Sequence, residues 1–288
     1  MPPTTLKFSS FAVAGGTGGL GKMIVAELVA RGVEVVVLAR TAPSKGVPGA
    51  SVRIIDYESE ESIVAALSGI EVVISALADA ALGVQPTLAE AAKKASVKLF
   101  VPSEFSNRSE SMPPDSLFAV KPAMHSLLRS LGLPYTLYYT GYFTDFIFIP
   151  EFGFDFASKS FDVVGAGDKL VTFTTRSDIA HFVAYTLTHL TIDKLSNVTL
   201  VVTGETRSMV SLKATFEQQF GGEFTILHRD VAEIERKVEE EGLAAAIDYI
   251  RLMEEYGWWD LSGKNDNALV PEWKPLTVSE TLTKYYAV

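Results

Sequence analysis

The 288-residue chain carries 25 basic and 35 acidic side chains, for a formal net charge of −10, and it has no cysteine. The lack of cysteine excludes disulfides, thiolate nucleophiles and Cys-ligated metals. The acidic balance, without any basic run, argues against nucleic acid or a membrane as a partner. Residues 1–5 lack the features of a secretory signal, and the longest weakly polar run, residues 131–144, is too short to span a bilayer. We therefore expect a cytoplasmic protein.

Strands and helices alternate through the first half of the chain, which is typical of a parallel sheet covered on both faces. Apolar runs predict strands at residues 11–14, 35–39, 52–55, 72–74, 98–101 and 135–139. Periodic stretches and their end signals predict helices at residues 20–31, 60–67, 86–95 and 121–131. This order predicts an α/β fold with a doubly wound parallel sheet of the Rossmann type, and a ligand across the carboxyl ends of its strands.

A glycine turn joins the first strand to the first helix. Residues 15–21 read GGTGGLG and fit both G-x-x-G-x-x-G and G-x-G-x-x-G. In a dinucleotide site such glycines allow a tight turn, close approach to a pyrophosphate and close helix–strand packing, while the helix start offers free N–H groups. A P-loop is one rival, since residues 16–22 fit G-x-x-x-x-G-K, but Met23 lacks the hydroxyl that would hold magnesium. A glycine turn without any ligand is the other.

The residues after the second strand predict which dinucleotide is bound. An acidic side chain there hydrogen-bonds the ribose of NAD, whereas a basic one accommodates the 2′-phosphate of NADP. The chain has Arg40 at this place, with Lys45 nearby and no carboxylate in the loop. The sequence therefore favours NADP(H), and a solvated arginine at a strand end is the alternative.

The pattern changes after Thr140, where phenylalanines become frequent. Runs at residues 161–164 and 170–173 flank a glycine turn and predict a hairpin, and Asp178 is expected to cap a helix that ends near Leu190. Later signals predict a strand at 198–203, helices at 211–220 and 231–256 with a break near Gly242, and a capping box at Thr277 and Glu280. We expect residues 1–140 to form the dinucleotide-binding domain, with segments such as 161–203 returning to it. Residues 141–288 would form mainly a smaller C-terminal substrate lobe.

Several motifs, in this order, resemble the isoflavone reductase-like branch of the atypical short-chain dehydrogenases, within the NmrA-like superfamily. They are GGTGGLG at 15–21, Arg40, VPSEF at 101–105, and FAVK at 118–121 followed by GLPYT at 132–136. The resemblance covers roughly residues 8–190, although Pro122, directly after Lys121, departs from the family's pattern. It implies a Rossmann domain, NADPH, a small aromatic or phenolic substrate in a cleft with the C-terminal lobe, and Lys121 as the catalytic lysine.

The predicted cofactor-binding residues combine the strand-end loops with these motifs. They are Gly15, Thr17, Gly18, Gly19, Leu20, Gly21, Arg40, Lys45, Asp56, Ala76, Leu77, Ser103, Glu104, Phe105 and Lys121. The four histidines are scattered without metal-ligand spacing, so no metal site is expected.

Lys121 lies near the start of a predicted helix, where the helix dipole opposes a positive charge. Partial burial there would weaken its hold on the proton and suit general acid–base work, whereas a surface lysine is the alternative. His125 lies four residues on, on the same helix face, where it could relay a proton or be an exposed or hydrogen-bonded bystander. Leu117 occupies the position that a Tyr-x-x-x-Lys pair would need, so that pair is absent.

Aromatic residues of the second half are candidates for the substrate pocket, with core packing as the alternative. They are Tyr142, Phe143, Phe146, Trp258 and Trp259. The resulting hypothesis is an NADPH-dependent reductase that acts on a small aromatic, enone or imine-like substrate as a monomer or homodimer, with Lys121 handling the proton. The rival is an NmrA-like regulator that senses NADP(H) without catalysis.

Overall fold

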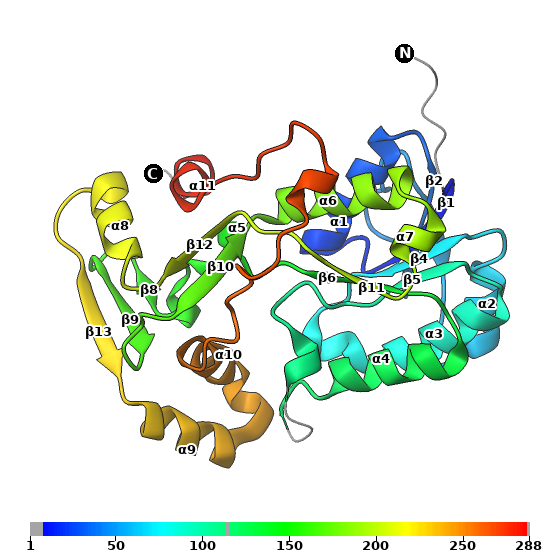
Figure 1. Ribbon diagram of the computed structural model, residues 1–288. Coiled ribbons are helices and arrows are strands. Elements are labelled where there is room, and N and C mark those ends of the chain that lie inside the picture. The colour runs from blue at the N-terminus through cyan, green and yellow to red at the C-terminus, as the bar shows by residue number, and fades with distance from the viewer. Residues whose placement is uncertain (1–7, 113–115, 287–288) are drawn as a thin grey trace.

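The computed structural model describes residues 8–112 and 116–286, so the expectation about residues 1–5 lies outside the described part. A five-stranded parallel sheet of order β3-β2-β1-β4-β5 forms the centre of the N-terminal half (Figure 1). Its strands are β1 (Ser10–Ala14), β2 (Glu34–Ala39), β3 (Ser51–Ile54), β4 (Val72–Ser75) and β5 (Leu99–Val101). A parallel bridge between Phe100 and Tyr135 continues the sheet to β6 (Thr136–Tyr139), which pairs in parallel with β11 (Val198–Val201). The doubly wound α/β prediction is confirmed.

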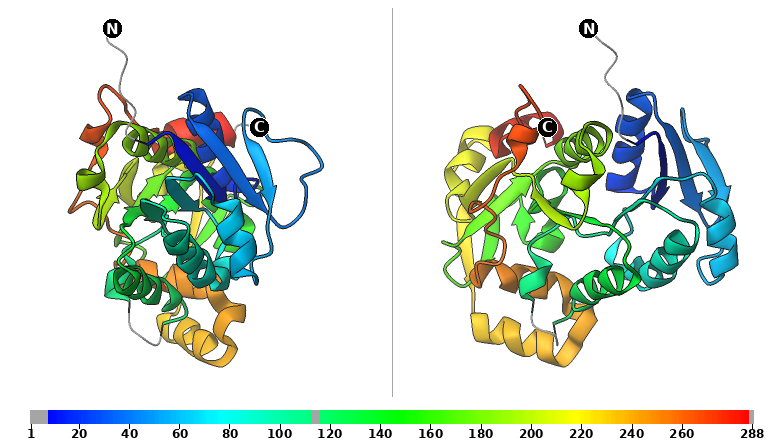
Figure 2. Two further views of the ribbon diagram at one scale, coloured as in Figure 1. Left: turned by 90° about the vertical axis from the view of Figure 1, so that its right-hand side faces the viewer. Right: turned by 45° about the vertical axis from the view of Figure 1, so that its right-hand side comes forward.

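Side chains of β1 alternate between two helical layers, as the twofold period of a strand requires. Phe11 and Val13 belong to the apolar cluster that contains buried residues of α1 (Gly19–Ala30) and α6 (Arg176–His189). Ala12 and Ala14 belong to the cluster on the opposite face, together with residues of three other helices. These are α2 (Glu60–Ala66), α3 (Gln85–Lys94) and α4 (Val120–Leu131). Figures 1 and 2 show α1 and α6 together on one side of the sheet, and the other three helices on the other side.

Two small sheets form the C-terminal lobe. One has the order β12-β10-β7 and the other the order β13-β9-β8. Their strands are β7 (Tyr142–Phe143), β8 (Phe154–Asp155), β9 (Ser160–Val164), β10 (Leu170–Thr174), β12 (Glu205–Ser208) and β13 (Thr225–Arg229). The helices are α5 (Thr144–Ile147), α8 (Leu212–Phe220), α9 (Val231–Glu241), α10 (Ala246–Glu255) and α11 (Val278–Tyr285), while the short α7 (Ile192–Leu195) precedes β11. Short 3₁₀ turns connect several elements: η1 (Asp79–Val84), η2 (Ser109–Ser111), η3 (Pro150–Phe152), η4 (Gly242–Ala245) and η5 (Asn267–Leu269).

Phenylalanines of residues 148–161 fill the core of this lobe. Phe148, Phe154 and Phe161 are buried and pack edge-on against Phe216 of α8. The ring centroids lie 5.3 to 5.9 Å apart, within the range of favourable aromatic pairs. Core packing therefore accounts for these rings.

The predicted hairpin at residues 161–173 is wrong. β9 pairs with β8 and β13, whereas β10 pairs with β7 and β12, so the two runs belong to different sheets. Gly165 and Gly167 both have φ of 65° and turn the chain away from β9. The Gly165 N–H then donates to the Arg229 carbonyl at the end of β13 instead of to β10.

The predicted N-cap Asp178 is also wrong, because the helix begins three residues earlier. Thr175 is the N-cap of α6, and its Oγ1 accepts from the Asp178 N–H at 3.1 Å. The Asp178 carboxylate instead pairs with the Thr175 hydroxyl and accepts from the Leu276 N–H at 3.0 Å. The break near Gly242 and the capping box of Thr277 with Glu280 are confirmed.

The chain crosses between the two halves several times. After β7–β10 it returns to the sheet as α6 and β11, and it leaves again at β12. Residues 261–273 then run back along the sheet, where Leu261 and Val270 are buried in the two apolar clusters on its faces. Asp266 satisfies the backbone of Val201 at the end of β11. The Val201 N–H donates to the Asp266 carboxylate and the Asp266 N–H donates to the Val201 carbonyl, both at 2.8 Å. Figure 1 shows this orange segment passing between the halves before α11.

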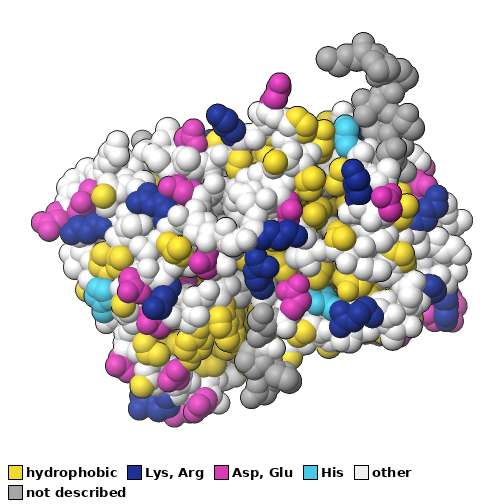
Figure 3. All heavy atoms as spheres, in the orientation of Figure 1, with side chains coloured by type: hydrophobic (Ala, Val, Ile, Leu, Met, Phe, Trp, Pro, Cys, Tyr) yellow, Lys and Arg dark blue, Asp and Glu magenta, His cyan; other side chains and the backbone are white. Residues whose placement is uncertain are grey.

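Among the described residues, no helix has the length and apolar character needed to cross a bilayer. Figure 3 shows cationic and acidic side chains interspersed over one face, without a broad field of either sign.

Candidate functional site

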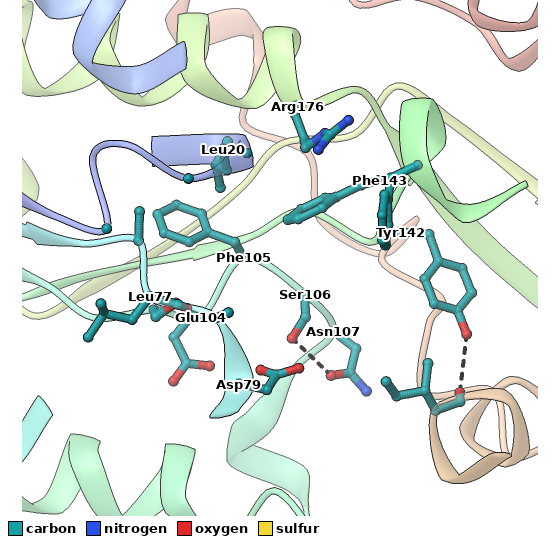
Figure 4. A pocket seen from close by; sticks show the side chains of 18 of the residues that line it. Leu20, Leu77, Asp79, Glu104, Phe105, Ser106, Asn107, Tyr142, Phe143 and Arg176 are labelled. Atoms are coloured by element: carbon teal, nitrogen blue, oxygen red, sulfur yellow. Dashed lines mark hydrogen bonds between the residues drawn. The ribbon is translucent and has the colours of Figure 1, made fainter. Parts of the chain in front are cut away.

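A cavity of about 570 Å³ lies at the carboxyl ends of β1, β4 and β5 and extends into the C-terminal lobe. Such a position is where ligands bind in doubly wound sheets, and the volume is typical of ligand sites. Its walls combine the glycine turn, the loops after β2, β4 and β5, the start of α4, and aromatic side chains of β7, α5 and the segment after α10. Figure 4 shows Leu20, Phe105, Phe143 and Arg176 around one space, with Ser106 and Asn107 at its side.

Some residues of the glycine turn pack against the backbone, and some line the cavity. A Cβ on Gly15 would lie 2.4 Å from the Ala76 carbonyl oxygen, and one on Gly21 would lie 2.1 Å from that of Gly15. Both positions therefore need glycine for the fold itself. Gly15 also lines the cavity, whereas Gly21, a predicted cofactor-binding residue, does not. Gly18 and Gly19 line the cavity at the start of α1, together with Thr17 and Leu20. Gly18, the N-cap, has φ of −81°, so its backbone alone would tolerate a side chain.

The start of α1 faces the cavity with N–H groups that lack intrahelical partners, as at any helix start. Its first turn contains no acidic residue that would neutralise its partial positive charge. This combination of cavity-lining glycines and an uncompensated helix start fits the phosphates of a dinucleotide.

Arg40 lines the cavity at the end of β2 and is exposed there. Lys45 and Asp56 do not line it, although both are predicted cofactor-binding residues. Lys45 is exposed in the loop that follows Arg40. Asp56 is exposed too, and its Oδ1 accepts from the Glu58 N–H at 2.9 Å, which forms a local turn before α2. Of the two basic residues predicted to select the cofactor, Arg40 lines the cavity and Lys45 does not.

The loops after β4 and β5 reach the cavity together. Ala76, Leu77, Ser103, Glu104 and Phe105 all line it, as predicted for the cofactor site. Ser103 joins the two loops, because its Oγ donates to the Leu77 carbonyl at 2.7 Å.

Lys121 also lines the cavity, from the first turn of α4, and is buried there. Its Nζ donates to the Glu104 carbonyl oxygen at 3.3 Å and to Ser106 Oγ at 3.0 Å. Ser106 Oγ in turn donates to Asn107 Oδ1 at 3.4 Å (Figure 4). The ammonium is thus fixed by two acceptors, and its third N–H is available for a ligand.

His125 does not line the cavity. It is buried, and its Nε2 lies 2.8 Å from Glu104 Oε1, while the Ser109 hydroxyl donates to Glu104 Oε2 at 2.6 Å. The imidazole also stacks on Tyr135 with ring centroids 6.4 Å apart. Because the histidine faces the Glu104 carboxylate and not the cavity, its geometry fits the bystander alternative and not a proton relay to a ligand.

The far end of the cavity is aromatic. Tyr142, Phe143, Phe146 and Trp259 line it, and the Tyr142 and Trp259 rings stack at 3.8 Å. Trp258, predicted as a pocket residue, lies outside the lining and packs on Tyr256 with centroids 5.6 Å apart. Of the two neighbouring tryptophans, Trp259 therefore faces the cavity and Trp258 does not.

A buried polar pair supports the aromatic end from behind. The Tyr142 hydroxyl lies 3.1 Å from the Ile250 carbonyl and 2.7 Å from Glu254 Oε1. One hydroxyl proton cannot be donated to both acceptors at once, whereas a protonated Glu254 supplies the second proton. Burial raises the pKa of Glu254 to about 7, although the Tyr142 hydroxyl and the Arg251 guanidinium favour the charged form. Burial likewise raises the pKa of Tyr142, with the Glu254 carboxylate adding to it.

Sequence reasoning missed about half of the lining. Ser106 and Asn107 directly follow the VPSEF motif, so extending that motif by two residues would have found them. Ala78 directly follows the predicted Leu77, and Phe118 opens the FAVK motif, so both were within reach of the same extension. Arg176 carries no comparable signal, because a distant segment brings it to the cavity. The other missed lining residues are Asp79, Ala81, Met112, Gly141, Ile147, Phe152, Ile250 and Met253. The described residues contain no cluster of His, Asp and Glu suited to a metal ion.

Comparisons with known proteins support the motif-based assignment. The model of the NmrA-like family matches residues 8–281. The isoflavone reductase homolog IRL of Zea mays is 28% identical over 307 residues, covering 96% of this chain and 98% of that protein. Oxidoreductase aprR of Aspergillus flavus is 29% identical over 264 residues, covering 85% and 88%.

Solved structures share the fold over nearly the whole chain. The binary complex of leucoanthocyanidin reductase with NADPH from Vitis vinifera superposes with a TM-score of 0.83 at 18% identity, covering 96% of this chain and 98% of that one. Because the family model spans nearly all described residues and the isoflavone reductase homolog of Zea mays matches over a similar length, the chain belongs to the NmrA-like family.

Proposed function

We propose that this protein is an NADPH-dependent reductase of a small aromatic, enone or imine-like substrate, with Lys121 as its general acid. The observation that carries the proposal is a single cavity that joins the glycine turn and Arg40 to Lys121 and an aromatic end. Relatives that are named reductases or oxidoreductases support the reaction class.

The residues present suit NADPH. Gly18 and Gly19 leave the helix start open to phosphates, and Arg40 offers a guanidinium that matches a 2′-phosphate. The leucoanthocyanidin reductase that shares this fold was solved with NADPH. Bound NADPH would supply the hydride, and the protein would supply orientation and an environment poor in water.

Lys121 is the residue best placed to supply a proton. Its Nζ is fixed by the Glu104 carbonyl and Ser106 Oγ, and both contacts use N–H donors without neutralising the ammonium. The remaining proton could therefore be donated to an oxygen or nitrogen of the substrate as negative charge develops there. Glu104 and His125 would position Lys121 indirectly. Their hydrogen bond fixes the segment whose carbonyl accepts from Lys121.

The aromatic end of the cavity favours a flat, largely apolar substrate. Tyr142, Phe143, Phe146 and Trp259 offer ring faces and edges, and Met253 and Ile250 add apolar surface. Asn107 is the amide on this wall and can hydrogen-bond a substrate oxygen or N–H.

A turnover assay tests the proposal. NADPH oxidation should be followed with a panel of phenolic ethers, enones and cyclic imines, with the Lys121→Ala protein as the inactive control. Substrate-dependent NADPH oxidation that Lys121→Ala loses would support the reductase. Tight NADPH binding without turnover on any compound class would contradict it and favour an NADP(H)-sensing regulator.

A further inference from the structure

Arg176 brings a guanidinium to the glycine turn from the far side of the cavity. It is the first residue of α6, whose N-terminal end lies beside that of α1. Arg176 Nη1 lies 2.8 Å from the position that a Cβ on Gly19 would occupy. Both Arg176 and Gly19 line the cavity. A glycine at position 19 is what allows the guanidinium to approach the helix start so closely.

Asp145 fixes the orientation of this guanidinium. Arg176 Nε donates to Asp145 Oδ2 at 2.9 Å, Nη2 donates to the Asp145 carbonyl at 3.3 Å, and the Arg176 backbone N–H donates to Oδ1 at 2.9 Å. The Asp145 side chain is almost completely buried. None of these contacts uses Nη1, so the nitrogen next to Gly19 keeps its donors for another acceptor.

The charges in this corner favour an anion. The start of α1 carries a partial positive charge, and no acidic residue in its first turn compensates it. Asp145 balances the charge of Arg176 but lies on the side away from Nη1. The N–H groups of α1 and the Nη1 donors therefore converge on the same part of the cavity, as in sites that hold a phosphate.

The position of Arg176 along the cavity indicates which phosphate of the dinucleotide it would contact. Its guanidinium lies over the Phe146 ring, 5.4 Å from the centroid, at the aromatic end. Arg40, which suits the 2′-phosphate, comes from the strand end on the other side of the glycine turn. We propose that Arg176 binds the nicotinamide-side phosphate of the dinucleotide and so closes the phosphate site from the C-terminal half. This inference rests on the proposed binding of NADPH.

The experiment compares two ligands in the full-length protein. NADPH contains both phosphates of the pyrophosphate, whereas 2′,5′-ADP has only the adenosine-side 5′-phosphate and keeps the 2′-phosphate. Arg176→Lys retains a charge that can pair with Asp145 but removes the second terminal nitrogen. We expect it to weaken NADPH binding about tenfold, the effect of losing one charge-assisted hydrogen bond, and to leave 2′,5′-ADP binding within about twofold of the wild type.

Two further proteins control for folding and charge. Arg229→Lys makes the same change in the ion pair with Asp248, whose Nη1–Oδ1 distance is 3.1 Å, in the C-terminal lobe and outside the cavity lining. It should leave both affinities unchanged. The double variant Asp145→Asn, Arg176→Gln avoids a buried unpaired carboxylate and should lose NADPH affinity at least as strongly as Arg176→Lys.

Each outcome has one meaning. Selective loss of NADPH affinity in both Arg176 variants supports the proposal. Wild-type NADPH affinity in these variants overturns it and leaves the reductase proposal standing. Equal losses for NADPH and 2′,5′-ADP also overturn it, because Arg176 would then act on the whole site. A wild-type protein that fails to bind NADPH overturns both proposals.

Discussion

Lys121 donates to a main-chain carbonyl and a hydroxyl, and neither of these acceptors is a carboxylate that would neutralise its charge. If it donates the proton that accompanies hydride transfer, Lys121→Ala should lower kcat by roughly 10²–10⁴, the usual size of a general acid–base contribution. Lys121→Arg should not restore turnover, because the guanidinium stays protonated. NADPH affinity, measured by nicotinamide fluorescence, should fall much less than kcat.

A lysine outside the cavity serves as the control for Lys121. Lys98 pairs with Glu71 at 2.7 Å on the surface, and Lys98→Ala should keep wild-type kcat. Near-normal turnover by Lys121→Ala on the true substrate would refute its catalytic role.

Arg40 should determine the choice between the two nicotinamide cofactors. We expect NADPH to bind at least about tenfold more tightly than NADH, because a charge-assisted contact to the 2′-phosphate contributes on the order of 1.5–3 kcal/mol before screening at an exposed site. Arg40→Ala should abolish this preference in a titration of both cofactors. Arg53 of β3 serves as the control. It pairs with Leu38 of β2 in the sheet and donates to the Ala66 and Ser68 carbonyls, and Arg53→Ala should keep the preference for NADPH. A preference unchanged in Arg40→Ala would contradict the assignment.

At the scale of the elements, two glycines of the turn between β1 and α1 have different roles. Gly18 lines the cavity, whereas Gly21 packs against the backbone of Gly15. Gly18 has an extended backbone, and its Cβ would meet only the Gly15 carbonyl, at 3.2 Å. Gly18→Val should therefore fold but bind NADPH far more weakly, since the side chain would occupy the space of the phosphates. Gly21→Val is the contrast, because its Cβ would lie 2.1 Å from the Gly15 carbonyl, and it should unfold at lower temperature. Circular dichroism and NADPH titration distinguish the two, and unchanged NADPH affinity in folded Gly18→Val would show that phosphates bind elsewhere.

Sequence patterns predicted the elements whose signals are local. The parallel strands, the break at Gly242 and the Thr277 capping box depend on neighbouring residues, and the structure confirms them. The hairpin at residues 161–173 failed because its partners, β13 and β12, lie far along the chain and compete successfully for each strand. Asp178 failed as a cap because Thr175, three residues earlier, offers the same kind of oxygen. Arg176 was missed because only the packing of α6 beside α1 brings it to Gly19.

At the scale of the whole molecule, one buried carboxyl makes stability depend on pH. Burial raises the pKa of Glu254 to about 7 in the folded protein, against 4.5 for a free glutamate, so the folded state binds more protons between these values. Stability therefore falls as pH rises through this window, by at most about 3.4 kcal/mol at about 1.36 kcal/mol per pKa unit. Glu254→Gln keeps a donor toward Tyr142 without the ionisation. It should raise the free energy of unfolding at pH 8 by up to about this amount and change it little at pH 4.5.

Denaturant unfolding at the two pH values measures this effect. Glu241, exposed at the end of α9, provides the control, and Glu241→Gln should leave stability unchanged at both. A gain for Glu254→Gln that does not vary with pH would show that packing, and not ionisation, is responsible.

The return of residues 261–273 along the sheet has a consequence for how the chain folds. β11 forms its ladder with β6 from residues about sixty positions earlier, and its contact with Asp266 comes from residues about sixty-five positions later. The Rossmann half cannot complete its apolar core during synthesis until most of the C-terminal half has emerged, because loops of this length must close before those contacts form. The nascent Rossmann half would thus hold exposed apolar surface for most of translation and would be prone to aggregation during that time. A chain ending before residue 261 would keep that surface permanently, even though the glycine turn, Arg40 and Lys121 would all be present.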